Sequence, residues 1–210
     1  MNIVPLIQIP CYEFQASDSL IDLVLSKCDL IKFTKTETNV VSQYTNLDIP
    51  ELSSWIEQCV DSVKNEIYPN IKGNLELTAV WMNRATKFQY HSKHSHANSL
   101  VSGIVYLSEP KKGGDTVFYY PNPWYSIHND GYFLLDNHDN LIEVQQTVKP
   151  KKGKTIIFPS TIKHNVTPTL DNDIRYTIAF NAFITGKLGN PLNATGLNIE
   201  SSTYDGKKYR

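Results

Sequence analysis

The stretch that decides the fold runs from Lys154 to Ile184 and reads KTIIFPSTIKHNVTPTLDNDIRYTIAFNAFI. Two segments in it, 154–158 and 174–184, are rich in β-branched and aromatic residues and are separated by proline, asparagine and aspartate. Segments of this kind, bounded by turn residues, are typical of β-strands. The same pattern begins at Leu75 and predicts strands at 75–83, 86–92, 99–108, 115–120, 131–135, 142–148, 154–158 and 174–184.

The first third of the chain instead carries apolar residues at helical spacing. One such segment follows the capping sequence Ser17-Asp18-Ser19 and fades near Cys28. A second begins at Pro50 and ends before Tyr68-Pro69. Two helices followed by eight strands predict a mainly β fold, a double-stranded β-helix (a jelly roll, cupin-like) with the N-terminal helices packed on one sheet.

Length, charge and hydropathy narrow the class of protein. A chain of 210 residues is expected to be a single domain over 1–210, with an N-terminal helical and strand support over 1–74, a jelly-roll core over 75–184 and a C-terminal tail over 185–210. Lys and Arg total 20 and Asp and Glu total 21, and the resulting net charge of −1 argues against nucleic acid as a partner. No stretch reaches the roughly 20 apolar residues of a membrane-spanning helix, and the start of the chain lacks the basic segment of an export signal. We therefore expect no membrane partner and a cytoplasmic location, whereas the sequence indicates no oligomeric state.

Histidines cluster in the six residues His91-Ser92-Lys93-His94-Ser95-His96. On a strand, side chains two residues apart point the same way, so His94 and His96 are predicted to converge, whereas His91 is out of phase and is expected at the surface or behind the site. Imidazole is the commonest side-chain ligand of first-row metals. His164 is a third candidate, because a jelly roll brings distant strands side by side. The alternative is a solvated polar strand end without a metal.

Arg175 lies in the apolar strand Ile174-Arg175-Tyr176-Thr177-Ile178-Ala179-Phe180. If its side chain points inward, the guanidinium needs an anion, because a buried unpaired charge is very costly. A carboxylate held by two parallel hydrogen bonds is its natural partner, and a small diacid would serve. The alternatives are that Arg175 faces solvent or pairs with an internal aspartate.

Five motifs in a fixed order resemble the Fe(II)- and 2-oxoglutarate-dependent oxygenases. The resemblance is greatest to the prolyl-4-hydroxylase-like members and to a group of uncharacterised microbial and phage proteins with a His-x-His motif. The match spans about residues 79 to 184. Its motifs are His94-Ser95-His96, Ser102-Gly103-Ile104-Val105-Tyr106-Leu107, Gly113-Gly114-Asp115-Thr116-Val117-Phe118, Phe158-Pro159 with His164, and Arg175-Tyr176-Thr177. The resemblance implies Fe(II), the cosubstrates 2-oxoglutarate and O₂, and hydroxylation of an unidentified primary substrate, with peptidyl proline suggested by the prolyl hydroxylases. Succinate and CO₂ would be the co-products.

The resemblance also implies the ligands of the iron, which would be His94, His96 and His164. The usual pattern in the family is His-x-Asp or His-x-Glu, so a neutral donor, His96, stands here where an anionic ligand is expected. Either the site is a three-histidine centre, or a carboxylate from elsewhere takes that place, with Asp115 and Asp136 available.

The same resemblance implies how the cosubstrate is held. Arg175 would form the salt bridge to the distal carboxylate of 2-oxoglutarate, helped by the hydroxyl of Thr177. Tyr106 matches a tyrosine that donates to the same carboxylate in relatives, and Asn83 stands where some relatives place a cosubstrate-binding asparagine. Because the metal performs the difficult step in this family, no catalytic residue beyond the metal centre is expected.

Two other classes of protein are compatible with these residues. One is a cupin-like three-histidine metalloprotein that does not use 2-oxoglutarate: Gly153, Pro159 and His164 keep much of the spacing of the second cupin motif, although the glycine and glutamate expected around the first are missing. The other is a non-catalytic jelly roll that acts as a binding module. Arg175 and Tyr106 discriminate, because an oxygenase needs them beside the metal. The aromatic segment 119–132 is expected to be a loop packed by its own side chains or a substrate-recognition lid.

Overall fold

The computed structural model describes residues 9–28, 34–35, 41–44, 49–69, 73–121, 143–189 and 196–200. Within these ranges the chain forms two helices and twelve strands, in the order β1 (Tyr12–Gln15), α1 (Asp18–Cys28), β2 (Thr34–Lys35), β3 (Val41–Tyr44), α2 (Pro50–Ile67), β4 (Asn74–Ala85), β5 (His91–His94), β6 (Val101–Tyr106), β7 (Thr116–Pro121), β8 (Glu143–Val148), β9 (Lys154–Pro159), β10 (Lys163–Val166), β11 (Arg175–Leu188) and β12 (Leu197–Ile199).

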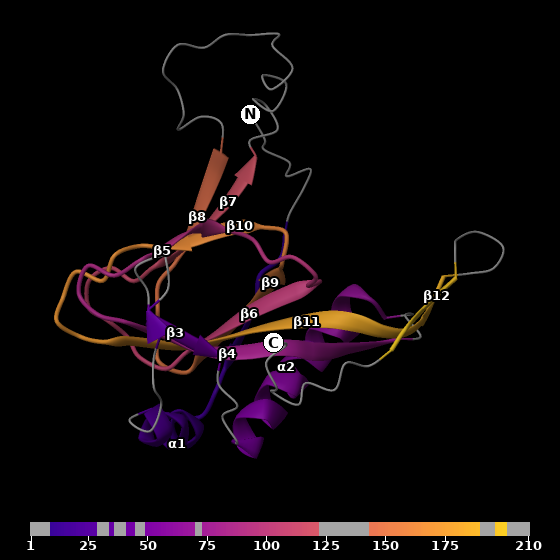
Figure 1. Ribbon diagram of the computed structural model, residues 1–210, viewed down its shortest axis with the longest axis horizontal. Coiled ribbons are helices and arrows are strands. Elements are labelled where there is room, and N and C mark those ends of the chain that lie inside the picture. The colour runs from indigo at the N-terminus through magenta and orange to yellow at the C-terminus, as the bar shows by residue number, and fades with distance from the viewer. Residues whose placement is uncertain are drawn as a thin grey trace, which may run out of the picture.

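The strands form two antiparallel sheets that face each other. The larger sheet has the order β1-β9-β6-β11-β4-β3-β2, with β12 paired to β11, and the smaller sheet has the order β5-β10-β7-β8. Strands far apart in sequence are neighbours in both sheets, as a jelly roll requires. Figure 1 shows three layers, with the helices below, the larger sheet in the middle and the smaller sheet above. The mainly β, double-stranded β-helix fold predicted from the sequence is confirmed.

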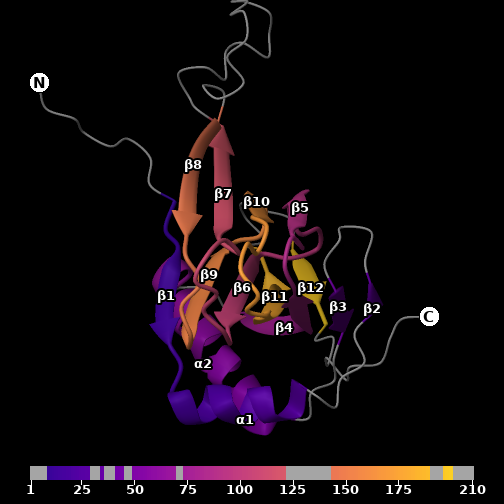
Figure 2. The same ribbon diagram turned by 90° about the vertical axis from the view of Figure 1, so that its left-hand side faces the viewer.

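Both predicted helices are present, and they pack on the outer face of the larger sheet (Figure 2). The backbone N–H of Leu20 donates to the Ser17 hydroxyl at the start of α1, and α2 begins with Pro50 in its first turn. Their apolar stripes share one core with the sheet strands, formed by residues that include Ile21, Val24, Ile56, Val60, Met82, Val105, Ile157, Ile178 and Phe180. At about 25 cal/mol per Å² of apolar surface, this burial is the main term that holds the helices in place.

The opposite face of the larger sheet points toward the smaller sheet. A second core lies there, formed by Ile104, Tyr106, Phe118, Ile156 and Phe158. Because side chains alternate along a strand, consecutive residues of β6 and β9 belong to different cores. The larger sheet therefore packs the helices with one face and supports the interior of the barrel with the other.

One strand predicted near the histidines is wrong in position, and one strand was missed. The chain leaves β4 at Ala85 and turns before β5 begins at His91, so the strand predicted at 86–92 is present only at 91–92. In this turn Phe88 has a φ of 67°, the Gln89 side chain accepts from the Thr86 backbone N–H, and the Phe88 N–H donates to the carbonyl of Thr169. The strand β10 was not predicted, and the predicted strand at 131–135 lies outside the described residues.

Among the described residues, no helix is long and apolar enough to cross a membrane. The division of the chain into support, core and tail stays a prediction, as do the cytoplasmic location and the role of segment 119–132, which is described only to Pro121.

Candidate active site

A cavity lies inside the barrel between the two sheets. Its walls carry the polar residues Asn83, His91, His94, His96, His164, Arg175 and Thr177. Asn83 comes from β4, Arg175 and Thr177 come from β11 in the larger sheet, and the histidines come from the smaller sheet and the loop after β5. Groups separated by more than 80 residues of sequence, such as Asn83 and Arg175, thus face one space.

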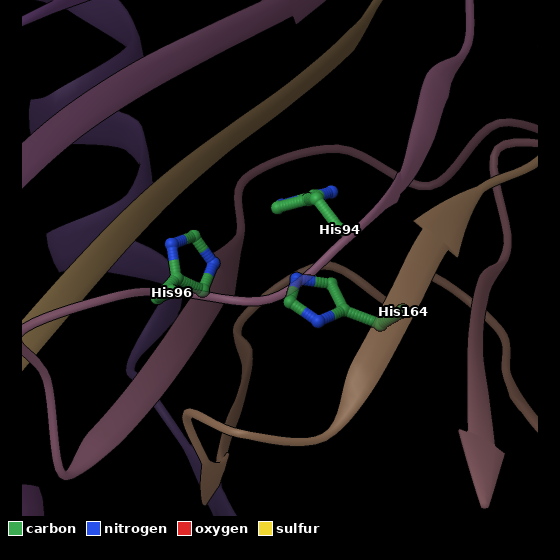
Figure 3. Close-up of side chains that lie close together, drawn as sticks. All are labelled: His94, His96 and His164. Atoms are coloured by element: carbon green, nitrogen blue, oxygen red, sulfur yellow. The ribbon is translucent and has the colours of Figure 1, made fainter.

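Three imidazoles meet at this cavity, as Figure 3 shows for His94, His96 and His164. One ligand atom from each ring lies within 4.8 Å of the others. The ring centroids of His94 and His164 are 4.3 Å apart, and those of His96 and His164 are 5.2 Å apart. This is a set of donors that suits a first-row divalent metal ion.

Strand pairing and a loop contact, rather than strand alternation, bring the three rings together. His164 on β10 is paired in register with His94 on β5. β5 ends at His94, so His96 lies in the following loop, where its backbone N–H donates to the carbonyl of Ser160 at 3.0 Å. The prediction that one regular strand carries both residues was therefore wrong, although the two rings still converge.

Backbone carbonyls fix the orientation of two of the rings. The Nδ1 atom of His94 lies 2.7 Å from the carbonyl oxygen of Ser92, and that of His164 lies 3.0 Å from the carbonyl oxygen of Ile162. With the proton on Nδ1 in these contacts, Nε2 keeps its lone pair for a metal ion. Burial, with a smaller contribution from neighbouring imidazoles, lowers the pKa of His164 to about 3 and that of His96 to about 4. Both rings are consequently neutral at pH 7, as metal ligation requires.

A chain of buried hydroxyl groups holds the two histidine-bearing segments together. The Ser160 hydroxyl contacts that of Ser99 at 2.6 Å and that of Ser102 at 2.8 Å, and Ser102 donates to Oδ1 of Asn181 at 2.7 Å. Ser99 precedes β6, Ser160 precedes β10 and Asn181 lies on β11. These hydrogen bonds therefore link the loop of His96 to the turn before His164 and to the larger sheet. Fully paired buried networks of this kind rigidify the segments that they join.

Arg175 supplies the positive charge of the cavity. Its side chain is 3% exposed; Nε donates to the carbonyl of Gly114 at 3.0 Å, and Nη1 donates to the Thr177 hydroxyl at 3.3 Å. A guanidinium has five N–H donors, so three of them have no acceptor among the described residues. No carboxylate in the described part of the chain forms an ion pair with it. Burial lowers the pKa of the guanidinium, but the group stays charged at neutral pH and still needs an anion.

Gly114 is suited to its place beside Arg175. Its φ of 72° lies in the left-handed region that favours glycine, and an added Cβ would come within 3.0 Å of Cδ of Arg175. The Gly113-Gly114 pair of the sequence motif therefore has a physical reason here, since it lets a backbone carbonyl approach the guanidinium.

The other predicted cosubstrate residues lie close to Arg175 in different ways. Thr177 lines the cavity and accepts from Arg175, and Asn83 lines the cavity with an amide oxygen that is buried without a hydrogen-bond partner among the described residues. Tyr106 is fully buried, with the centre of its ring 5.6 Å from Cζ of Arg175, and its hydroxyl contacts that of Thr116 at 2.8 Å. Burial raises the pKa of Tyr106 to about 12, so the phenol keeps its proton. Tyr106 is not among the residues that line the cavity, and its contact with the cosubstrate stays a prediction.

The metal-binding group found among the described residues contains no carboxylate. Asp115 is described and is not part of it, and Asp136 lies outside the described residues. The three-histidine alternative is thus the one that the described geometry favours.

His91 is the residue of the cavity that sequence analysis misplaced. Between the pairs His94–His164 and His91–Val166, β5 advances by three residues while β10 advances by two, which is the signature of a β-bulge. The extra residue restores the phase, so His91 and His94 both line the cavity. Their rings stack with centroids 4.2 Å apart and planes inclined by 22°. No feature of the sequence alone marks the bulge.

The cavity and the fold can now be compared with known proteins. The sequence model of the family described as "Putative 2OG-Fe(II) oxygenase" matches residues 79–181. Over this range the chain is similar to the Fe(II)- and 2-oxoglutarate-dependent oxygenases. The matched range includes the polar residues named above for the cavity, and the cofactors of this family are Fe(II) and 2-oxoglutarate. A search of curated proteins finds no match.

Several solved structures share the fold of this chain. A viral collagen prolyl hydroxylase from Paramecium Bursaria Chlorella virus-1, in complex with 2-oxoglutarate, is 15% identical, with a TM-score of 0.57 and coverage of 82% of this chain and 94% of that chain. A prolyl-4-hydroxylase from Pseudomonas putida is 16% identical, with a TM-score of 0.55 and coverage of 82% and 92%. A Streptomyces hygroscopicus protein solved with nickel, 2-oxoglutarate and hygromycin B is 13% identical, with a TM-score of 0.57 and coverage of 83% and 82%.

Proposed function

We propose that this oxygenase holds Fe(II) with His94, His96 and His164, anchors the distal carboxylate of 2-oxoglutarate with Arg175, and hydroxylates a C–H bond of an organic primary substrate. The observation that supports this most is the composition of the cavity. A buried guanidinium, three of whose N–H donors have no acceptor in the described part of the chain, faces the same space as a cluster of imidazoles. A cupin-like metalloprotein without 2-oxoglutarate would have no use for that guanidinium, so the oxygenase is the better supported function.

The residues present suit both groups. Two neutral imidazoles, of His96 and His164, offer lone pairs to a divalent ion, and Arg175 with Thr177 suits a carboxylate. Bound Fe(II) would supply O₂ activation coupled to decarboxylation of 2-oxoglutarate, with succinate and CO₂ as products. A centre with three neutral ligands carries one more positive charge than one with a carboxylate, which favours binding of a dianion.

The protein's own residues would orient the bound groups and keep water out of the cavity. The Thr177 hydroxyl and the Gly114 carbonyl fix the plane of the guanidinium, so its free N–H donors are already oriented. Trp81 packs 5.7 Å from the ring of His96, and Phe158 packs 4.9 Å from the ring of His164. These aromatic rings shield the imidazoles from bulk solvent and strengthen the electrostatic interactions in the cavity.

For the primary substrate we propose only that it is an organic molecule with a C–H bond to hydroxylate. Prolyl hydroxylases and a protein solved with hygromycin B share this fold, so the fold supports more than one class of substrate. A proline-rich peptide is the first substrate to test, because the motifs resemble those of the prolyl-4-hydroxylase-like members.

Succinate formation tests the proposal without knowledge of the primary substrate. The protein is incubated aerobically with Fe(II) and 2-oxoglutarate, and we expect slow succinate release that Arg175→Ala abolishes and the control Lys111→Ala leaves unchanged. His94→Ala and His164→Ala should strip the metal, measured as iron retained after gel filtration. Absence of both turnover and 2-oxoglutarate binding in the wild type would overturn the proposal in favour of the cupin-like alternative.

A further inference from the structure

The β-bulge in β5 places a fourth imidazole in the cavity, in addition to the three that form the metal-binding group. His91 and His94 would point to opposite sides of a regular strand three residues apart, yet both line the cavity because the bulge adds one residue to β5 relative to β10. Bulges that re-aim a side chain are over-represented next to active sites.

His91 lines the cavity that holds both ends of the proposed ligand site, the metal-binding group and Arg175. Its ring stacks on that of His94, with centroids 4.2 Å apart, which places it beside the metal-binding group. Arg175 lines the same cavity as His91. A dicarboxylate that reaches from the imidazoles to the guanidinium would therefore occupy a cavity that has His91 in its wall.

The ring nitrogens of His91 are available to such a ligand. Among the described residues His91 has the stacking contact with His94 and no hydrogen-bond partner, whereas His94 and His164 each use Nδ1 on a backbone carbonyl. An imidazole offers at least one N–H donor whether neutral or protonated. A partly buried donor without an acceptor is a cost that a bound carboxylate would remove.

We propose that His91 donates a hydrogen bond to the 2-oxoglutarate bound between the metal-binding group and Arg175, and so is a cosubstrate-binding residue that does not ligate the metal. This inference rests on the proposed function and adds a residue to it. Its role differs from that of Arg175, because His91 contributes a directional donor, while the guanidinium contributes the countercharge.

Equilibrium dialysis with labelled 2-oxoglutarate and the Mn(II)-loaded protein tests the proposal without turnover. His91→Phe keeps an aromatic ring that can stack on His94 but has no N–H, and His91→Asn keeps a donor but cannot stack. We expect His91→Phe and His91→Ala to weaken 2-oxoglutarate binding by about 10- to 100-fold and His91→Asn to recover part of the loss. Mn(II) affinity, measured by the electron paramagnetic resonance signal of the free ion, should change by less than about threefold. Ser92→Ala is the matched control, because the Ser92 side chain is exposed on the same bulge and its backbone carbonyl remains.

The outcomes separate this inference from the proposed function. If the wild type binds Mn(II) but no 2-oxoglutarate, the proposed function fails, and this inference fails with it. If Arg175→Met loses 2-oxoglutarate while His91→Phe binds it like the wild type, only the role of His91 is refuted. If His91→Phe and His91→Ala lower Mn(II) affinity as much as 2-oxoglutarate affinity, His91 acts through His94, and the direct contact is wrong. Circular dichroism confirms that each variant is folded, and His91→Asn provides a second test if the larger Phe side chain is not accommodated.

Discussion

Replacement of Arg175 by methionine should separate ligand binding from stability of the fold. In the unliganded protein the guanidinium is buried without an ion pair among the described carboxylates. Methionine removes the cost of burying that charge, which is several kcal/mol. It also removes two hydrogen bonds, to Gly114 and Thr177, each worth about 1.5–3 kcal/mol because the donor is charged. The two terms nearly cancel, so the free energy of unfolding should change by less than about 2 kcal/mol.

The effect on the liganded protein is far larger. At a 2-oxoglutarate concentration of about 100 times Kd, the wild type gains about 2.7 kcal/mol, which corresponds to a rise in Tm of roughly 5–11 °C for a protein of this size. Arg175→Met should show no such rise. The assay is thermal unfolding of the Mn(II)-loaded protein with and without 2-oxoglutarate, and Arg84→Met is the matched control, because Arg84 is on neighbouring β4 but does not line the cavity. A ligand-induced shift that persists in Arg175→Met, or a loss of more than about 4 kcal/mol without ligand, would refute the reasoning.

Three further predictions concern the support of the site. Ser160→Ala removes one hydrogen-bond partner from each of the Ser99 and Ser102 hydroxyls. We expect the free energy of unfolding, measured in urea, to fall by about 1–3 kcal/mol, together with weaker Mn(II) binding. The control Ser62→Ala, at an exposed position of α2, should change neither quantity. Gly103→Ala would place its Cβ against the buried ring of Phe180, so it should lower the free energy of unfolding by about 1–3 kcal/mol. A second substitution, Phe180→Leu, should recover part of that loss. Equal stability of Gly103→Ala and the wild type would contradict this packing. In metal-free protein the pKa of His164 is lowered from 6.5 to about 3 and that of His96 from 6.5 to about 4, so the folded state binds protons less readily than the unfolded state. Their contribution to stability is then complete above pH 6.5 and is lost as the pH falls from 6.5 toward about 3, and a urea midpoint that stays constant from pH 7 to 4 would disprove this.

Much of the fold could be predicted because its periodicities are strong. Each of these elements buries one or both faces, so its apolar residues predict its position to within a few residues. This holds for the apolar stripe of α2 and for the apolar runs of β6, β9 and β11. β10 was missed because it is short and polar in sequence, Lys163-His164-Asn165-Val166, and exists through its pairing with β5 and β7. Pairing between distant strands leaves no local signal in the sequence.

The same distinction applies to the site. The geometry brings together the three histidines and Arg175 that the motifs pointed to, because these residue types are unusual among apolar strands. The position of His91 could not be predicted, because a bulge depends on how two strands pair and not on the residues of either strand. The hydroxyl chain around Ser160 was also missed, since serine in a turn is ordinary and acquires its role only when Ser99 and Ser102 are folded against it.

The alternation of side chains along β11 has a consequence for how this protein can change. Odd-numbered positions 175, 177 and 179 face the cavity, whereas even-numbered positions 178, 180 and 182 belong to the core shared with the helices. Substitutions at position 179 can therefore alter which molecule is accepted without a change in the core shared with the helices, whereas Arg175 and Thr177 are the residues proposed to hold the cosubstrate. An insertion or deletion of one residue would exchange the two sets, so new specificities in this lineage should arise by replacement of side chains in this strand and not by changes in its length.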